Sequence, residues 1–195
     1  MPPTNLFSRR EFTLRLASLL PTIGIAGAPF ASMRCASANS ARGPHALPAD
    51  EISHNAEAIQ QEVTFKASPK RVCDVLTETK LFDKVVQASA AMKSGMITAK
   101  VPTQISPEVG GAFTIFGGHI VGRQIELVPA QRVVQAWRVV DWAPGVYSIA
   151  HFELTADGSG TRLVLDHTGF PVGGAAHYAE GWRVNYWQPM EKTLA

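Results

Sequence analysis

The fold is decided by residues 108–171, EVGGAFTIFGGHIVGRQIELVPAQRVVQAWRVVDWAPGVYSIAHFELTADGSGTRLVLDHTGFP, taken together with residues 181–187, GWRVNYW. The first stretch holds short β-patterned segments joined by Gly- and Pro-marked turns, at 111–116, 119–128, 132–140, 146–155 and 161–168. The second stretch belongs to a single amphipathic helix. Strands followed directly by one helix favour an α+β fold, in which a curved antiparallel sheet wraps around the C-terminal helix.

The residues upstream add one strand and two short helices. Apolar residues at period two predict a first strand at 59–66. Ser68 and Pro69 then provide a cap and a first-turn proline for a helix. A second short helix is expected at 79–85, whereas residues 87–107 show no clear pattern. We therefore expect a sheet of six to seven strands with two short helices after its first strand.

The C-terminal helix has one apolar face. Its members recur at spacings of three to four residues and are Ala179, Trp182, Tyr186, Met190 and Leu194. Pro189 lacks a backbone donor and clashes with the preceding turn, so it should kink or break the helix near residues 185–188. Trp182 and Tyr186 are then expected to face the sheet, either as core residues or as contacts for a ligand.

Several motifs in these stretches resemble one known family. They are Val109-Gly110-Gly111-Ala112-Phe113, Gly117-Gly118-His119-Ile120-Val121-Gly122-Arg123, Gln135-Ala136-Trp137-Arg138 with Asp141-Trp142, Gly160-Thr161-Arg162-Leu163, His167-Thr168-Gly169-Phe170-Pro171, and Gly181-Trp182-Arg183 with Tyr186-Trp187. The resemblance is to bacterial single-domain homologues of the C-terminal domain of the heat-shock protein 90 ATPase activator, within the START-like (SRPBCC) superfamily. It runs from about Ile59 to Leu194 and implies a helix-grip fold. Related domains bind lipids, cyclise polyketides or assist chaperones, so the resemblance leaves the function open.

The N-terminus is typical of an export signal. Ser8-Arg9-Arg10-Glu11-Phe12 matches the twin-arginine motif, and a modestly apolar run at 16–31 follows. This run is short and interrupted by proline and glycine, so no stable membrane span is expected. Ala36-Ser37-Ala38 supplies a cleavage pattern with Asn39 as the mature N-terminus. We expect the twin-arginine translocase as a partner during export, and a periplasmic or secreted location.

Two other interpretations of the cleavage region fit the sequence less well. Cleavage after Ala28 would leave Pro29 directly after the cut, which signal peptidase tolerates badly, and Arg34 does not suit a lipoprotein reading of Cys35. An uncleaved N-terminal anchor remains open. The predicted organisation is a signal peptide at 1–38, a flexible leader at 39–58 and one domain at 59–195.

Cleavage would change the charge and the cysteine count. The full chain has 18 basic and 16 acidic residues and a formal net charge of +2. Removing residues 1–38 leaves 14 and 15, so the net charge becomes −1. Without a clustered basic face, nucleic-acid binding has no electrostatic basis. Cys73 would remain as the single cysteine, which excludes an intramolecular disulfide and favours a buried thiol over a reactive one.

Side-chain alternation predicts which residues face the helix. In the segment 119–128, apolar Val121, Ile125 and Leu127 indicate an inward odd face, which would also carry His119 and Arg123. The same test turns two further sets inward, Ala150, Phe152 and Leu154, and Leu163, Leu165 and His167. The segment 132–140 is apolar on both faces, and Trp137 is placed on the inner one.

The sequence holds no recognisable catalytic constellation. The domain's histidines, His119, His151, His167 and His177, lack zinc-site spacing, and neither a nucleophile elbow nor a phosphate or dinucleotide loop is found, so no metal or cofactor is expected. His167 could be a general base, a polar anchor in an apolar cavity, or a structural histidine. An inward Arg123 would need a partner, either a ligand carboxylate or a resident acid such as Glu108 or Asp141.

The resulting hypothesis is an exported helix-grip domain that binds a small apolar or amphipathic molecule. Its candidate ligand-binding residues are Arg123, Trp137, His167, Trp182 and Tyr186. Two other hypotheses stay open: a cyclase- or hydrolase-like enzyme that uses His167 with an acid, and a chaperone cofactor as the family resemblance implies. Export argues against the last, because an ATP-driven chaperone would be cytoplasmic.

Overall fold

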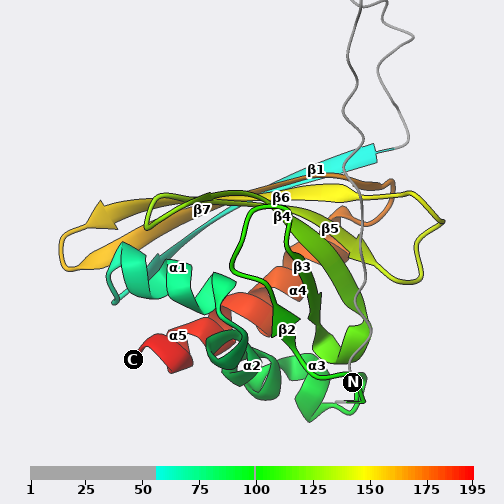
Figure 1. Cartoon of the computed structure of the whole chain (residues 1–195), viewed down its shortest axis with the longest axis horizontal. Helices are drawn as coiled ribbons and strands as arrows, with labels where there is room; N and C mark the ends of the chain where they lie inside the picture. Colours follow the sequence, from blue (N-terminus) through cyan, green and yellow to red (C-terminus); the bar gives the residue numbers. More distant parts are fainter. Residues whose placement is uncertain (1–55, 99) are drawn as a thin grey trace, which may run out of the picture. The chain divides into compact units, whose positions relative to one another are not determined.

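The computed structural model describes residues 56–98 and 100–195 (Figure 1). The predicted signal peptide, its cleavage site and nearly all of the leader lie outside the described residues. The described chain forms two layers: a curved sheet, and helices that cover one face of it (Figure 1). This is the expected α+β helix-grip architecture.

The sheet has seven strands, all paired antiparallel, in the order β1-β7-β6-β5-β4-β3-β2. Successive hairpins build its centre, and the last strand, β7, pairs with the first strand, β1, which forms one edge. The strands are β1 (Ala56–Phe65), β2 (Gln104–Ile105), β3 (Ala112–Ile115), β4 (Ile120–Val128), β5 (Arg132–Val139), β6 (Ser148–Asp157) and β7 (Gly160–Pro171).

The helices lie together on the inner face of the sheet (Figure 1). They are α1 (Pro69–Thr77), α2 (Thr79–Ala88), α3 (Ala90–Lys93), α4 (Ala175–Trp182) and α5 (Gln188–Leu194), with a 3-10 turn, η2 (Phe116–Gly118), between β3 and β4. The predicted cap of α1 is confirmed: Ser68 Oγ accepts a hydrogen bond from the Arg71 N–H at 3.4 Å, and Pro69 stands in the first turn.

The segment 87–107, which the sequence left unassigned, adds α3 and the edge strand β2. Ser89 caps α3, because its Oγ accepts from the Met92 N–H at 3.2 Å. The hydroxyl of Thr79 fixes β2 against α2, since it donates to the Ile105 carbonyl at 3.1 Å and accepts from the Ile105 N–H at 2.9 Å. Both elements are very short, and β2 depends on a partner 26 residues away, which explains their weak sequence pattern.

The inward face predicted for β4 is wrong. Ile120, Gly122 and Gln124 point into the core, whereas Arg123 and Ile125 are exposed. The strand register shifts between Gln124 and Glu126, so Ile125 is an extra residue in a β-bulge. A bulge reverses the alternation of side chains along a strand, which is why the apolar odd positions misled the prediction.

Gly122 is required at its inward position. A Cβ built there would lie 2.1 Å from the Ala136 carbonyl oxygen and 2.2 Å from the Phe113 ring. The Phe113 side chain therefore lies over this glycine, which allows the sheet and the inner layer to approach closely.

The other face predictions are confirmed. Ala150, Phe152 and Leu154 of β6 are buried, as are Leu163, Leu165 and His167 of β7, and Trp137 lies on the inner face of β5. These side chains meet the helices in one continuous apolar core. Cys73 belongs to this core, and desolvation raises the pKa of its thiol, in agreement with a packing role.

The C-terminal helix continues past Pro189 through a π-helical turn at Arg183–Trp187. The Gln188 N–H donates to the Arg183 carbonyl, a five-residue spacing that inserts one extra residue before Pro189 in the next turn. The break expected near 185–188 therefore takes the form of a π-bulge. The bulge buries the adjacent Tyr186 and Trp187 together.

Candidate functional site

A pocket of about 270 Å³ lies beneath the C-terminal helix. One wall is that helix, another is formed by the adjoining ends of β4 and β5 with η2, and a third comes from α3 and the residues after it. The lining residues are Ala91, Met96, Ile97, Phe116, His119, Ile120, Trp137, Val139, His177, Tyr178, Gly181, Trp182, Asn185 and Tyr186. Most of these are apolar or aromatic, as in sites that take small organic ligands.

Three of the predicted site residues, Trp137, Trp182 and Tyr186, meet at this pocket. The ring centroids of Trp182 and Tyr186 are 4.1 Å apart, and those of Trp137 and Trp182 are 5.9 Å apart. All three side chains are at most 5 % exposed. They are therefore core residues and pocket residues at once: the core fixes their positions and the pocket exposes part of their surface to its interior.

Two polar atoms of these residues have no hydrogen-bond partner within the described chain. They are Nε1 of Trp137 and Oη of Tyr186, both shielded from solvent. Leaving such a group unpaired costs about 1–3 kcal/mol. Burial raises the pKa of the Tyr186 phenol.

His167 lies behind Trp182 and does not line the pocket. It is completely buried, and both ring nitrogens are engaged. The Trp182 indole N–H donates to His167 Nδ1 at 3.0 Å, which places the imidazole proton on Nε2. Nε2–H then donates to Ser148 Oγ at 2.7 Å, and the Ser148 hydroxyl donates to the Trp137 carbonyl at 3.1 Å.

This network corrects the prediction that His167 serves as a base or ligand anchor. Desolvation lowers its pKa to about 4, so the ring is neutral at physiological pH. A neutral imidazole with both nitrogens hydrogen-bonded to the protein has no free lone pair for catalysis. His167 instead holds the indole of Trp182, and through it α4, against β6 and β7.

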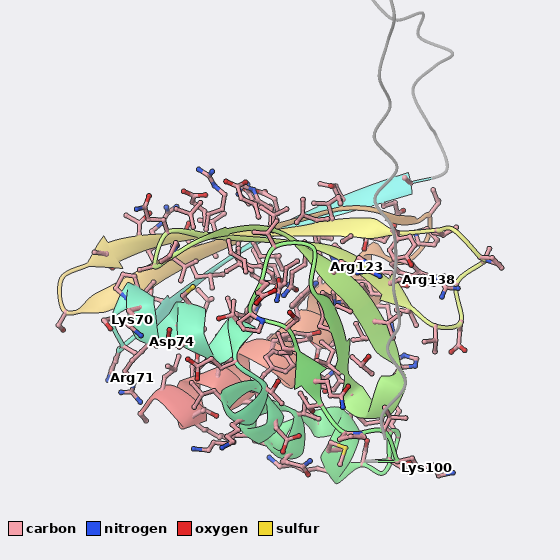
Figure 2. The ribbon with its side chains drawn as sticks, viewed as in Figure 1. Lys70, Arg71, Asp74, Lys100, Arg123 and Arg138 are labelled. Atoms are coloured by element: carbon pink, nitrogen blue, oxygen red, sulfur yellow. The ribbon has the colours of Figure 1, made fainter. Side chains whose placement is uncertain are left out.

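The prediction that Arg123 belongs to the site is also wrong. It lies on the outer, exposed face of β4, and its Nη1 donates to the Gly110 carbonyl at 2.9 Å. Figure 2 shows it beside Arg138 of the neighbouring strand β5, at the opposite end of the view from Lys70, Arg71 and Asp74 of α1. The β4 bulge accounts for this error, and neither Glu108 nor Asp141 is its partner among the described ion pairs.

The pocket also includes residues that were not predicted to lie in it. His177, Tyr178 and Asn185 come from the C-terminal helix, and Met96 and Ile97 from the unassigned segment. His119, expected on an inward face, instead borders the pocket after η2 as an exposed residue, with its Nδ1 4.0 Å from Asp141 Oδ2. Tyr178 could have been found from sequence, because it lies four residues before Trp182 on the same helical face.

The pocket has a neutral character. No Asp, Glu, Lys or Arg is found among the described residues that line it. Asn185 Oδ1 is already occupied, since it accepts from the Ala91 N–H at 2.9 Å and ties α3 to the π turn. Tyr178 Oη accepts from the Trp142 indole at 2.8 Å. The unpaired Trp137 and Tyr186 atoms lie behind the pocket surface, because each has almost no accessible area.

Two further observations cover residues 56–98 and 100–195. No helix in this part of the chain is long and apolar enough to cross a membrane. No group of three or more His, Cys, Asp or Glu side chains in it is arranged to hold a metal ion.

This sheet, wrapped around a C-terminal helix with a pocket between them, defines a helix-grip domain. The family model described as "Activator of Hsp90 ATPase homolog 1-like protein" matches residues 66–195. The chain therefore belongs to the family of Hsp90 ATPase activator homologue 1-like proteins.

The chain matches only part of the length of its curated relatives. An activator of 90 kDa heat shock protein ATPase homolog from Dictyostelium discoideum is 33 % identical over 89 residues, 45 % of this chain and 23 % of that protein. Homolog 1 from Homo sapiens is 23 % identical over 131 residues, 67 % of this chain and 35 % of that protein. The chain thus spans about a quarter to a third of the curated relatives it matches.

Among solved structures, an HSP90 activator from Plasmodium falciparum superposes with a TM-score of 0.58 at 22 % identity. The alignment covers 72 % of this chain and 96 % of that one. At this identity the similarity supports the fold alone.

Proposed function

We propose that this protein binds a small, mainly apolar molecule in the pocket beneath its C-terminal helix. The observation that carries this proposal is the pocket itself, about 270 Å³ of space bordered by aromatic side chains within an otherwise packed core. Ligand sites typically measure about 300–1,000 Å³, so the ligand should be small. Trp137, Trp182 and Tyr186 are its proposed contacts, and Arg123 and His167 are not.

Gly181, which lies next to Trp182, allows a direct test of whether a ligand occupies the pocket. It lines the pocket from α4, and a Cβ built on it meets no atom within 4 Å. A large side chain at this position would project into free space and fill the pocket. A methyl group would leave most of the space open. Both side chains raise helix propensity over glycine, alanine by more than phenylalanine.

The experiment measures melting temperature with a panel of fatty acids and aromatic compounds. A ligand that binds only the folded state adds RT ln(1 + [L]/Kd) to stability, so binders raise the melting temperature of the wild type. Gly181→Ala should keep this rise and Gly181→Phe should lose it. Binding in this pocket would be contradicted if no compound raised the melting temperature of the wild type. It would also be contradicted if the compounds raised the melting temperature of Gly181→Phe by the same amount.

An enzyme of the cyclase or hydrolase type has less support. The proposed base, His167, is held in a closed hydrogen-bond network, and the described pocket wall supplies no acid to act with it. His119 and His177 border the pocket, but no Ser, Thr or Cys is found among the described residues of its wall.

Chaperone activation is the competing proposal, because the relatives' descriptions name Hsp90 ATPase activation. The chain corresponds to a minor part of those proteins, 23 % and 35 % of their lengths. The twin-arginine motif would moreover direct this chain away from a cytoplasmic chaperone. Stimulation of Hsp90 ATPase activity by the purified protein, with no effect of Gly181→Phe, would favour this alternative.

A further inference from the structure

The outer face of the sheet carries an apolar centre that no described helix covers (Figure 1). On this face Ile125 of β4 is 49 % exposed and Ile149 of β6 is 39 % exposed. The strand between them, β5, adds Val134 and Ala136, and Ala136 lies directly opposite Ile149 in the register. An open apolar patch with polar residues around it is typical of a surface that contacts another protein.

Two arginines stand at one end of this apolar centre. Arg123 lies opposite Ala136 in the register, and Arg138 follows Ala136 by two residues on the same face. Figure 2 shows the two arginines beside each other. Their guanidinium groups donate to backbone carbonyls, and neither forms an ion pair within residues 56–98 and 100–195. This end of the face is therefore positive.

Carboxylates gather at the other end of the apolar centre. They are Glu126 of β4, Glu153 of β6 and Asp166 of β7. Arg132 bonds to Glu126 at 3.0 Å and to Glu153 at 2.9 Å, so three carboxylates share one arginine and this end is negative. Glu126 and Asp166 border a hollow of about 390 Å³ in the outer face, and Ile149 lines the same hollow.

We propose that this face pairs with the same face of a second copy of the chain. A two-fold axis that lies between the two faces and runs across the strands near Ile149 turns the positive end of each copy onto the negative end of the other. The apolar centres then meet, and Arg123 and Arg138 gain carboxylate partners. A nucleic acid or an anionic membrane would instead be repelled by the acidic end. The face is thus complementary in charge to itself.

This proposal is independent of the proposed function. The ligand pocket is bordered by the C-terminal helix, which lies on the opposite side of the sheet, so a dimer formed through the outer faces leaves the pocket open. Loss of the dimer should therefore leave the ligand-induced rise in melting temperature unchanged.

Sedimentation velocity of the purified protein over a wide range of concentrations measures the oligomeric state. The wild type should change from monomer to dimer as its concentration rises. Added salt should weaken the dimer, because the contacts between its ends join charges near the surface. A wild type that stays monomeric at its highest soluble concentration would overturn the proposal.

Two charge reversals test whether this face forms the contact. Arg123→Glu removes the net positive charge of one end, and Asp166→Lys removes the net negative charge of the other. Each alone should raise the dissociation constant of the dimer by about tenfold or more, because the axis repeats the lost attraction at two places. Arg71→Glu makes the same charge change on α1, outside the face, and should leave the dissociation constant unaltered.

A mixture of the two variants provides the most specific test. Arg123→Glu and Asp166→Lys should form a heterodimer that is tighter than either homodimer. It keeps one native pair of opposite ends and places the new glutamate at the same end contact as the new lysine. This test holds even if one variant is less stable, since loss of folding cannot create affinity between two different variants. Unchanged dimerisation in Arg123→Glu, an equal loss in Arg71→Glu, or a heterodimer no tighter than the homodimers would each overturn pairing through this face.

Discussion

Single side chains in the inner layer are held by hydrogen bonds as much as by burial. His167 shows this most clearly, because its two nitrogens join Trp182 of α4 to Ser148 of β6. Protonation of Nδ1 would remove the acceptor for the Trp182 indole and place a charge among Trp137, Phe170 and Tyr178, which surround the ring. The folded state therefore disfavours the protonated form.

The lowered pKa of His167 predicts that the stability of the protein depends on pH. The pKa of His167 is about 4 in the folded protein and should be about 6.5 in the unfolded chain. As pH falls below about 6.5, the unfolded chain takes up a proton first, so stability is complete above this pH and declines towards pH 4. The loss attributable to His167 should approach about 3 kcal/mol.

Denaturant unfolding from pH 7.5 to 4.5 checks this prediction. Replacing His167 with glutamine should lower stability at neutral pH, because one or both hydrogen bonds are lost. It should also flatten the decline at acidic pH. A decline of the same steepness in His167→Gln would assign the pH dependence to other groups, such as the carboxylates in surface ion pairs.

At the scale of secondary-structure elements, β4 shows how one extra residue changes which side chains of a strand point into the core. Gln124 and Gln135 are buried side by side, with Gln135 Nε2 donating to Gln124 Oε1 at 3.3 Å. The bulge at Ile125 then turns that isoleucine outwards, where 49 % of it is exposed. An inward glutamine and an outward isoleucine invert the usual pattern of polarity.

The inversion predicts unequal losses of stability for the same substitution at two isoleucines of β4. Ile120→Ala should destabilise the protein by about 2–5 kcal/mol, because it leaves a cavity in the core. Ile125→Ala should change stability by less than about 0.5–1 kcal/mol, since its side chain lies in solvent. Urea unfolding of both variants measures the difference, and equal losses would show that β4 carries no bulge at this position.

The elements also show what the sequence could predict. Long alternating segments, the Ser68 cap and the apolar face of the C-terminal helix predicted most strands and helices within a few residues. The same periodicities predicted that Trp137, Trp182 and Tyr186 lie on the same side of the sheet. Each of these signals is local, so it depends on residues within one or two turns or strands.

Features that depend on distant partners escaped prediction. The bulge at Ile125 is set by pairing with β5, and β2 is held by the hydroxyl of Thr79, 26 residues away. The role of His167 depends on Ser148 and Trp182, which contact it from other elements. The pocket is likewise lined by residues from separate segments, so no single stretch of sequence predicts it.

At the scale of the whole molecule, export and ligand binding are linked proposals. The twin-arginine route carries folded proteins, so the domain would cross the membrane with its pocket already formed. Replacing Arg9 and Arg10 with lysines should leave the precursor in the cytoplasm, whereas the wild type should mature to Asn39. Cell fractionation with mass analysis of the N-terminus measures this outcome. Undiminished periplasmic protein from the double variant would contradict twin-arginine export.

The most direct test of the central claim is a two-dimensional NMR titration of the ¹⁵N-labelled protein with the aromatic compound that raises its melting temperature most, followed through its tryptophan indole signals. Trp137 and Trp182 line the pocket, while the Trp187 indole is hydrogen-bonded to Gln61 at 2.7 Å outside it. We predict that the Trp137 and Trp182 signals shift together and saturate with one dissociation constant, while the Trp187 signal moves least. Indole signals that all stay in place at saturating ligand, or shifts confined to residues of the outer sheet face such as Arg123, would contradict binding beneath the C-terminal helix.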